Sequence, residues 1–507
     1  MVKSKNTSVK SVFIFATVLS IIAWIISYRS GFVLTYNDAA SHLNIARRVI
    51  DNLTPGIAQI GTVWLPLPHL LMLPLVQSTF LWHTAIAGSL VSMGAFIISV
   101  VFIYKLIYLV GKHRYGAILG TLAMALNPNF LYLQSTPMTE PLFLATLIVS
   151  VYYLAKYVQN KKILDLVLTG TFVMMTTLVR YDGWFLFVYL LALLPVWGYF
   201  TLGKKRTEGI FFLFASIGGF GILLWLLWNW AIFSDPIYFM TGPYSAHAQQ
   251  EVLQSVGQLP TKGNLFTASS YFVWSIIANN GIVLTLTGGI GILATLLILK
   301  KKKQILSLLA ISSPLLFNIL ALYMGHSAMN VPQATLNPGY FNIRYGLLVL
   351  PVIAFVVGIL ASVKPFGWIM FGLITIQTLL FIPQGKPVVL IDGLRGLKNT
   401  YHTVEASQWL AENYQKGLIL TSLASHDAFV ARTGLPMKLY IHEGTREHWQ
   451  EALKMPSKKV SYIALISYPP DVVYKALENN SDFKKNYKLV HSYGTFEIYE
   501  LQNEKNN

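Results

Sequence analysis

The sequence predicts a polytopic α-helical membrane protein with a small extracytoplasmic α/β domain at its C-terminal end. Three observations support this fold class. The chain of 507 residues is 54% hydrophobic and only 12% charged, whereas soluble domains carry about twice that charged fraction. Long apolar runs recur along residues 1–383, and the basic residues collect in every second connection between them. Such a chain needs a bilayer as its solvent.

About 11 transmembrane helices are expected, because each apolar run has about the 20 residues that cross a bilayer. The runs cover residues 11–33, 83–104, 115–134, 137–155, 163–180, 184–203, 209–233, 271–299, 305–324, 345–363 and 365–383. The first run resembles a secretory signal, but it is long, lacks a small-residue cleavage site and precedes further spans. We therefore expect it to be an anchor.

The basic residues predict the orientation of these spans. The N-terminal tail and alternate connections contain most of them, namely Lys3, Lys5, Lys10, Lys105, Lys112, Arg114, Lys156, Lys161, Lys162, Lys204, Lys205, Arg206, Lys300, Lys301, Lys302, Lys303 and Lys364. The other connections contain Arg29, Arg47, Arg48, Arg180, Lys262 and Arg344. Because basic loops stay in the cytoplasm, the N-terminus is expected inside and the C-terminus outside. The long connections then lie outside, where we expect the function.

Charge and composition exclude several function classes. The net charge of +17 is explained by cytoplasmic loops that face membrane lipids, and no nucleic-acid partner is expected. The chain contains no Cys, which excludes disulfides, thiolate catalysis and cysteine metal sites.

The tail beyond residue 383 is more charged, and its apolar runs are shorter. Strands are predicted over residues 417–423, 460–467 and 493–501. Amphipathic helices are predicted over residues 403–415, 446–455 and 469–480. Because strands alternate with helices, we predict an extracytoplasmic α/β domain over 384–507, after a transmembrane domain over 1–383.

Three acids, Asp38, Glu140 and Asp182, lie at predicted outer span edges. A charge there is costly unless it has a partner or a function. Asp38 opens the stretch "YNDAASHLNIARR", which reads as an amphipathic helix along the outer surface. Asp38 is either the N-cap of this helix or an active-site acid, and His42 follows four residues later on the same face.

The other charged residues at this face also have two interpretations. Glu140 in "LQSTPMTEPLF" either complements a helix N-terminus or has a functional role. Arg180 and Asp182 in "VRYDGW" form either a local ion pair or part of a site. Arg344 in "GYFNIRYGLLVLP" either snorkels to the interface or holds a phosphate bidentately. Together, two acids and an Arg at one membrane face suit a reaction on a lipid phosphate.

These motifs resemble those of the type-C glycosyltransferases. Within that group the chain is similar to the family 39-like enzymes, which are related to protein O-mannosyltransferases and the aminoarabinose transferase of lipid A. The resemblance rests on "YNDAASH", "TPMTEPL" and "NIRYG", in this order and on one side of the membrane. "LVRYDGW" and "DPIYFMTGPYSAHAQ" also look like bacterial and archaeal members. The resemblance covers residues 1–383, and it extends to the overall layout, in which an outer domain follows the membrane part.

The resemblance implies an inverting glycosyltransferase of the cell membrane that acts on the extracytoplasmic face. A polyprenyl-phosphate sugar would be the donor, and a lipid, polysaccharide or protein hydroxyl the acceptor. Asp38 would be the general base, and Arg344 the main cation for the leaving phosphate. Glu140 would bind sugar or acceptor, or hold Arg344 or His42. Further substrate-binding candidates are Tyr345, Arg180, Asp182, His42, Tyr244 and His326.

The resemblance implies no required cofactor. Many relatives carry two adjacent acids in the first loop, whereas Asp38 is flanked by Asn37 and Ala39. A divalent metal would therefore need Asp38 and His42, with help from Glu140 or His326.

Three other functions remain open from the sequence. The chain could be a flippase or transporter of lipid-linked sugars, although such proteins carry internal symmetry and charges near mid-span. It could transfer a preassembled glycan to Asn, as oligosaccharyltransferases do, although the paired first-loop acids are missing. It could also be a scaffold without activity.

Overall fold

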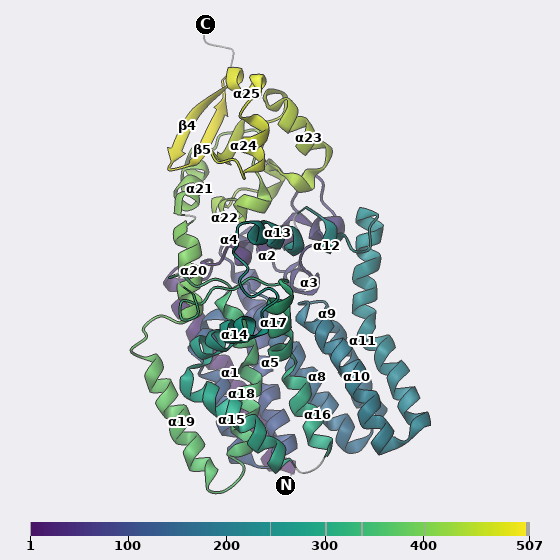
Figure 1. Cartoon of the computed structure of the whole chain (residues 1–507). Helices are drawn as coiled ribbons and strands as arrows, with labels where there is room; N and C mark the ends of the chain where they lie inside the picture. Colours follow the sequence, from purple (N-terminus) through teal and green to yellow (C-terminus); the bar gives the residue numbers. More distant parts are fainter. Residues whose placement is uncertain (1, 244, 300–301, 336–337, 400, 503–507) are drawn as a thin grey trace. The chain divides into compact units, whose positions relative to one another are not determined.

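The computed structural model describes residues 2–243, 245–299, 302–335, 338–399 and 401–502. The described chain is mostly helical and divides into two compact units (Figure 1). Unit 1 comprises Met1–Phe32, Thr62–Pro68 and Ser89–Asp392, and unit 2 comprises Val33–Gly61, His69–Gly88 and Gly393–Asn507. The predicted domain division between residues 383 and 384 stays a prediction. The sequence did not indicate that residues 33–61 and 69–88 group with the C-terminal segment.

Unit 1 contains the long apolar helices and, between them, several short helices. They are α1 (Val2–Arg29), α5 (Ile86–Gly111), α6 (Arg114–Ala125), α7 (Pro128–Leu133), α8 (Glu140–Asn160), α9 (Ile163–Thr177), α10 (Asp182–Leu202), α11 (Lys204–Phe233), α12 (Tyr238–Thr241), α13 (Ala246–Ser255), α14 (Leu265–Asn280), α15 (Ile282–Ile298), α16 (Lys302–Ile311), α17 (Ser313–Met324), the 3-10 helix η2 (Ile343–Val349), α18 (Leu350–Leu360) and α19 (Phe366–Phe381). Helices α9, α10 and α11 pack side by side (Figure 1).

Among the described residues, 6 helices are long and apolar enough to cross a membrane. They are α1, α5, α8, α10, α11 and the continuous run of η2 and α18. The pair of α16 and α17, bent by 40°, makes a seventh if it is one span, and α9, α15 and α19 are shorter apolar helices. The chain is therefore a multi-pass helical membrane protein, as the sequence predicted.

Like the run of α16 and α17, two further runs that were predicted as single spans are not single helices, because each consists of two helices. The run 115–134 is interrupted at Asn127, whose side chain accepts hydrogen bonds from the backbone N–H groups of Asn129 and Phe130 and so caps α7. Pro128 occupies the first turn of α7, where its missing N–H costs nothing. The run 271–299 is interrupted at Gly281, whose φ of 78° ends α14.

Helices α6 and α18 approach each other closely at glycines. A Cβ on Gly120 would lie 2.4 Å from the backbone oxygen of Ala354, and one on Gly116 would lie 2.4 Å from that of Gly358. Small residues four apart allow two helix backbones to meet in this way, and van der Waals packing then holds the helices together in lipid.

Unit 2 combines the sheet with short helices. Its helices are α2 (Asn37–Arg48), η1 (Ile57–Ile60), α4 (Thr79–His83), α21 (Tyr401–Asn413), α22 (Leu423–Thr433), η3 (Met437–Leu439), η4 (Glu443–Thr445), α23 (Glu447–Lys454), η5 (Pro456–Lys458), α24 (Val472–Leu477) and α25 (Ser481–Asn486). Helices α3 (Leu67–Met72), α5 and α20 (Val388–Asn399) contain residues of both units.

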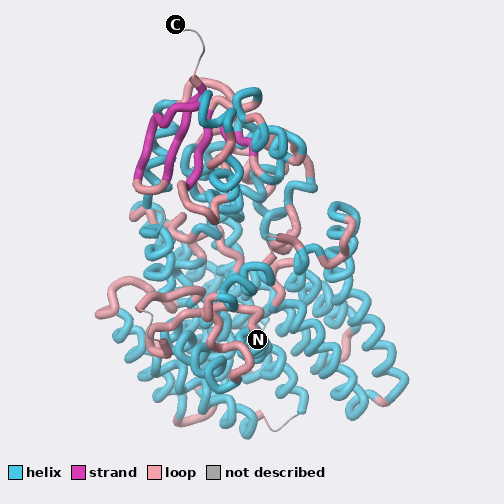
Figure 2. The backbone as a smooth tube through the Cα atoms, turned by 45° about the horizontal axis from the view of Figure 1, so that its top comes forward, coloured by secondary structure: helices cyan, strands magenta, loops and turns pink. Residues whose placement is uncertain are grey.

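The strands of unit 2 are β1 (Ile419–Leu420), β2 (Tyr440–Ile441), β3 (Tyr462–Ile466), β4 (Tyr487–Tyr493) and β5 (Phe496–Leu501). Within the described residues they form a 5-stranded sheet in the order β2-β1-β3-β5-β4 (Figure 2). β1 is parallel to β2 and β3, whereas β5 is antiparallel to β3 and β4. The mixed α/β character of the C-terminal part is confirmed. The strands β2 and β4 were not predicted, because β2 is two residues long and β4 is a polar edge strand.

The α6–α18 contact can be tested with Gly120→Ala. The added methyl group meets backbone, which has no side chain to move aside, so we expect a loss of about 1–3 kcal/mol in the free energy of unfolding. Gly94→Ala on α5 is the control, since a Cβ there meets nothing within 4 Å. Thermal unfolding of the detergent-solubilised full chain measures both variants. Equal unfolding midpoints would contradict the close approach.

Candidate functional site

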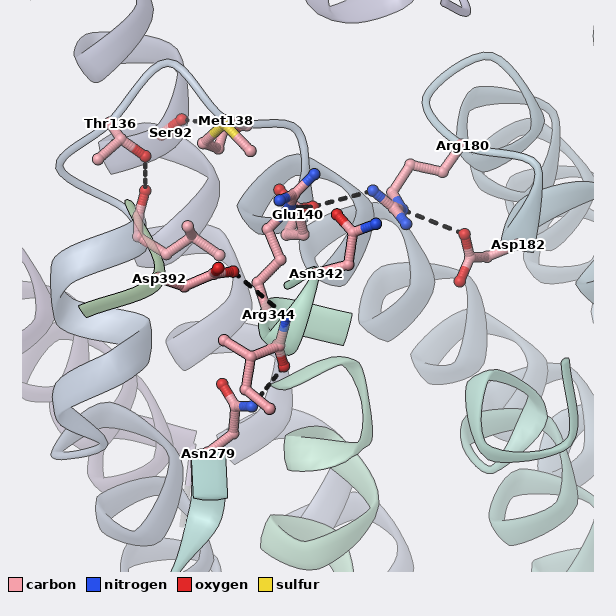
Figure 3. Close-up of polar contacts among 12 residues, drawn as sticks. Ser92, Thr136, Met138, Glu140, Arg180, Asp182, Asn279, Asn342, Arg344 and Asp392 are labelled. Atoms are coloured by element: carbon pink, nitrogen blue, oxygen red, sulfur yellow. Dashed lines mark hydrogen bonds and ion pairs between the residues drawn. The ribbon is translucent and has the colours of Figure 1, made fainter. Parts of the chain in front are cut away.

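A buried carboxylate lies at the centre of the candidate site in unit 1 (Figure 3). Glu140 is the first residue of α8, and its side chain is 0% exposed. Its Oε1 accepts one hydrogen bond from Nη1 of Arg180 and another from Nε of Arg344, both at 3.0 Å. One oxygen atom thus joins two guanidinium groups that are far apart in the sequence.

Arg180 lies in the turn between α9 and α10, which brings it close to Glu140. Its Nε donates to Oδ2 of Asp182 at 3.1 Å, so the local ion pair expected from the sequence is present. Asp182 also accepts a hydrogen bond of 3.3 Å from Nδ2 of Asn318 on α17. Burial disfavours the charge of Arg180, but the carboxylates of Asp182 and Glu140 outweigh this and raise its pKa above the ordinary value.

Arg344 is positioned by the short helix η2. The last residues of α14 hold this helix: Nδ2 of Asn279 donates to the backbone oxygen of Ile343 at 2.6 Å, and Nδ2 of Asn280 donates to that of Gly346 at 3.1 Å. The backbone N–H of Ile343 donates to Oδ2 of Asp392 at 3.3 Å. A 3-10 helix is weakly held by its own hydrogen bonds, so these side chains fix the direction of Arg344.

The loop before Glu140 is fixed by hydroxyl groups. The Oγ of Ser92 donates to the backbone oxygen of Met138 at 3.1 Å, and that of Ser89 donates to the backbone oxygen of Ser135 at 2.8 Å. Oγ1 of Thr136 donates to Leu133 at 2.6 Å. The start of α8, and with it Glu140, is thereby held against α5.

Tyr345 completes this cluster, because its ring contacts both cations. The guanidinium carbon of Arg180 lies 5.0 Å from the ring centroid and that of Arg344 lies 5.2 Å from it. The aromatic face stabilises both charges. Two planar cations held this close together, with their fork of donors, can recognise a phosphate group. Oε2 of Glu140 has no hydrogen-bond partner among the described residues.

Asp38 and His42 belong to unit 2, on α2. Of the two interpretations of Asp38, the N-cap is wrong, because Tyr36 occupies that position and Asp38 lies half-buried inside the first turn. Nδ1 of the buried His42 lies 2.9 Å from Nε2 of His69. The sequence did not indicate this partner, since His69 lies in the proline-rich stretch 63–74.

The position of α2 along the outer surface stays a prediction, but its polar residues do not face water, since they are buried within unit 2. Nδ2 of Asn44 donates to the backbone oxygen of Asp427 at 2.8 Å. Arg47 forms an ion pair of 2.8 Å with Asp51, and Asp51 accepts hydrogen bonds from the backbone N–H groups of Met437 and Lys438. The polar face of α2 therefore contacts the C-terminal segment rather than water.

Asp427 on α22 is the most perturbed acid of this contact. Its Oδ2 accepts a hydrogen bond of 2.5 Å from Oγ of Ser41. Burial raises the pKa of Asp427 to about 6, although the bond from Ser41 and the nearby charge of Arg48 act in the opposite direction.

Of the remaining candidates, Tyr244 and His326, the structure describes only His326, which joins neither group of contacts. Tyr244 lies outside the described residues. His326 follows the end of α17 and is exposed, and its backbone oxygen accepts a hydrogen bond from Nε2 of Gln250. Among the described residues, no three His, Asp or Glu side chains are grouped so that they could hold a metal ion.

The cluster also contains residues that were not predicted from the sequence, namely Asn318, Asn279, Asn280 and Asp392. The Asn residues had a detectable signal, because an amide inside or at the end of an apolar run needs a partner. Asp392 gave no such signal, since it lies beyond the predicted spans.

Comparison with known structures shows the fold of this chain. ArnT from Cupriavidus metallidurans, in a structure bound to undecaprenyl phosphate, superposes with a TM-score of 0.57 at 10% identity, over 96% of this chain and 97% of that chain. The oligosaccharyltransferase AglB from Archaeoglobus fulgidus, in complex with an inhibitory peptide and a dolichol-phosphate, gives 0.52 at 11% identity, over 99% and 75%. A structure of the Archaeoglobus fulgidus oligosaccharyltransferase with Zn and sulfate gives 0.53 at 11%, over 89% and 67%.

No protein-family model matches the chain. No curated protein matches its sequence. The structural likenesses confirm that the chain has the fold of the type-C glycosyltransferases, as the sequence resemblance predicted.

The charge balance of the cluster can be tested with Glu140→Gln. Gln keeps the shape but leaves two neighbouring guanidinium groups without their shared anion, so we expect a loss of about 3–5 kcal/mol in the free energy of unfolding. Glu208→Gln on α11 is the control, because Glu208 is exposed. Thermal unfolding of the full chain in detergent distinguishes the two. A Glu140→Gln variant as stable as the control would show that the ion pairs contribute nothing.

The contact between α2 and α22 predicts a pH effect on stability. Because the pKa of Asp427 is raised to about 6, the folded chain holds a proton that the unfolded chain releases near pH 4. The stabilisation from this group is present below about pH 4 and is lost as the pH rises through about 6. We expect Asp427→Asn to flatten this part of the curve of unfolding midpoint against pH. Curves of equal slope for wild type and variant would contradict the raised pKa of Asp427.

Proposed function

We propose that this chain is an integral-membrane inverting glycosyltransferase that moves a sugar from a polyprenyl-phosphate donor to an acceptor hydroxyl. The observation that carries the proposal is the cluster of Glu140, Arg180 and Arg344 in a chain with the type-C glycosyltransferase fold. ArnT, which shares this fold over nearly its whole length, was crystallised with undecaprenyl phosphate. A phosphate at the end of a membrane-embedded lipid is the anion that two interfacial guanidinium groups would bind.

Arg344 is the main cation for the phosphate in this proposal, with Arg180 as the second. Both are positioned before substrate arrives, so little reorganisation is needed as negative charge develops on the leaving oxygen. Glu140 keeps the two cations in place against their mutual repulsion, and Tyr345 lies against both. Asp182 supports Arg180 through their ion pair.

Asp38 is the general base in the proposed reaction. The acceptor hydroxyl oxygen attacks the anomeric carbon while Asp38 takes its proton. The bond between the anomeric carbon and the phosphate oxygen breaks, and its electron pair leaves with the polyprenyl phosphate. Phosphate is a good leaving group, so the step requires no second carboxylic acid. His42, His326 and Tyr244 remain substrate-binding candidates.

The distribution of Lys and Arg supports an orientation with the N-terminus inside and the C-terminus outside. Glu140 begins α8, whose other end leads to Lys161 and Lys162. The Glu140 cluster would then lie on the extracytoplasmic side, where a lipid-linked sugar meets a lipid, polysaccharide or protein acceptor.

A second candidate function is the transfer of a whole glycan to an Asn side chain, since the oligosaccharyltransferase AglB shares the fold. The acceptor separates the two functions: that reaction needs an Asn-containing peptide, whereas the proposed reaction needs a hydroxyl. A transporter of lipid-linked sugars would move label across the membrane without forming a product.

The assignment of the base is tested with Asp38→Asn. Membranes that contain equal amounts of wild type and variant are incubated with radiolabelled polyprenyl-phosphate sugars and a hydroxyl acceptor. We expect the variant to lose about a hundredfold or more of the transfer rate, the size of a general-base contribution.

The control for this experiment is Glu478→Gln, which removes an exposed acid of unit 2 and should keep the wild-type rate. Equal rates for Asp38→Asn and wild type would remove Asp38 from the mechanism. If wild type forms no product with any hydroxyl acceptor, but labels an Asn-containing peptide or moves the donor across the membrane, the proposed function is wrong.

A further inference from the structure

A second polar site lies in unit 1 at the other end of the spans from Glu140. It is a cavity of about 570 Å³ between α1, the last turns of α5 and α8, and the start of α6. Gln159 lines it near the end of α8, which begins at Glu140. A helix rises about 1.5 Å per residue, so the two positions are about 28 Å apart along α8. This is close to the thickness of the hydrocarbon core of a bilayer, about 30 Å.

The cavity carries positive charge that no carboxylate balances. Lys105, Lys112 and Arg114 line it, and none of the described residues that line it is an Asp or a Glu. None of these three cations forms an ion pair with a described residue. The neighbouring Lys156 differs, because it pairs with Asp165 at 2.8 Å.

Aromatic rings hold Lys105 in place beside the cavity. Its Nζ lies 4.1 Å from the ring centroid of Phe102 and 4.7 Å from that of Tyr152. Lys105 is half-buried and lies inside the apolar helix α5. A lysine that served only to mark the cytoplasmic side would be better placed in water, where its charge is solvated. Three cations around one cavity attract an anion.

The surroundings of the cavity favour an anion that is carried by a lipid. Val9 and Leu109 provide apolar walls. Helix α1 beside it exposes most of its apolar surface, since only 11% of its membrane-length window is buried in the protein. Acyl chains can therefore lie along α1 while a headgroup enters the cavity, whose size is that of ordinary ligand sites.

We propose that this cavity binds a phosphate group, carried by an anionic membrane phospholipid. The ammonium groups and the guanidinium group would donate to the phosphate oxygens, and basic pockets between membrane helices bind anionic headgroups in this way. The site is separate from the Glu140 cluster and does not depend on the function proposed for it.

The test is native mass spectrometry of the purified full chain in detergent, titrated with phosphatidylglycerol, phosphatidylcholine or inorganic phosphate. We expect phosphatidylglycerol to bind at least about tenfold more tightly than the other two. The double variant Lys105→Gln/Arg114→Gln should lose about tenfold or more in affinity for phosphatidylglycerol. Each basic side chain next to an anionic lipid raises the binding constant by up to about tenfold.

The matched control is Lys204→Gln/Arg206→Gln, which removes one Lys and one Arg from exposed positions at the start of α11. It should bind phosphatidylglycerol as the wild type does. Lys105→Arg keeps the charge and should also keep binding, which separates loss of the site from misfolding. Equal losses in both double variants, or tight binding of phosphatidylcholine, would overturn the proposal. If inorganic phosphate binds as tightly as phosphatidylglycerol, the claim that a lipid carries the phosphate is wrong.

Discussion

The carboxylate of Glu140 is fully buried, and its charge is compensated by two guanidinium groups on one of its oxygen atoms. A buried charge without a partner is among the most costly features a folded chain can contain. The partners of Glu140 come from the α9–α10 turn and from η2, so pairing this one acid brings three separate segments of unit 1 together. The Ser, Thr and Asn contacts around it all act to keep those segments in place.

The same arrangement explains how two cations can be kept side by side before a substrate binds. Arg180 and Arg344 would repel each other if Glu140 were absent, and each would turn to water or to a different acceptor. With Glu140 between them and the ring of Tyr345 against both, their donors keep a defined direction. In the proposed function a phosphate would meet a prepared site, so the free energy of binding would not be lost in ordering the side chains.

Unit 2 follows the same physical rule with different residues. Its helix α2 carries Ser41 and Asn44 toward α22, where the side chain and the backbone oxygen of Asp427 satisfy them. Arg47 pairs with Asp51, and Asp51 accepts hydrogen bonds from the backbone of η3. The first loop and the C-terminal segment are therefore one compact body, although several hundred residues separate them in the chain. A change in the C-terminal segment will act on α2, the helix that carries Asp38.

The sequence by itself determined the class of the protein. Apolar runs of membrane length, alternating basic loops and the strand–helix alternation after residue 383 are local patterns, and the structure contains a multi-pass helical part and a mixed sheet. The charged motifs around Glu140, Arg180 and Arg344 could also be recognised in the sequence, because a charge at the edge of an apolar run is costly unless it is paired or functional.

Tertiary structure alone decided which of these charges pair and which segments belong together. The shared oxygen of Glu140, the contact of His42 with His69 and the burial of the polar face of α2 join residues that are distant in the chain, and no local periodicity encodes such contacts. The breaks at Asn127 and Gly281 were also missed, since hydropathy measures the length of an apolar run and not the continuity of its backbone hydrogen bonds. The local sequence pattern indicates which face of a segment can be buried. The pairing of its polar side chains depends on which partners the fold brings within hydrogen-bonding distance.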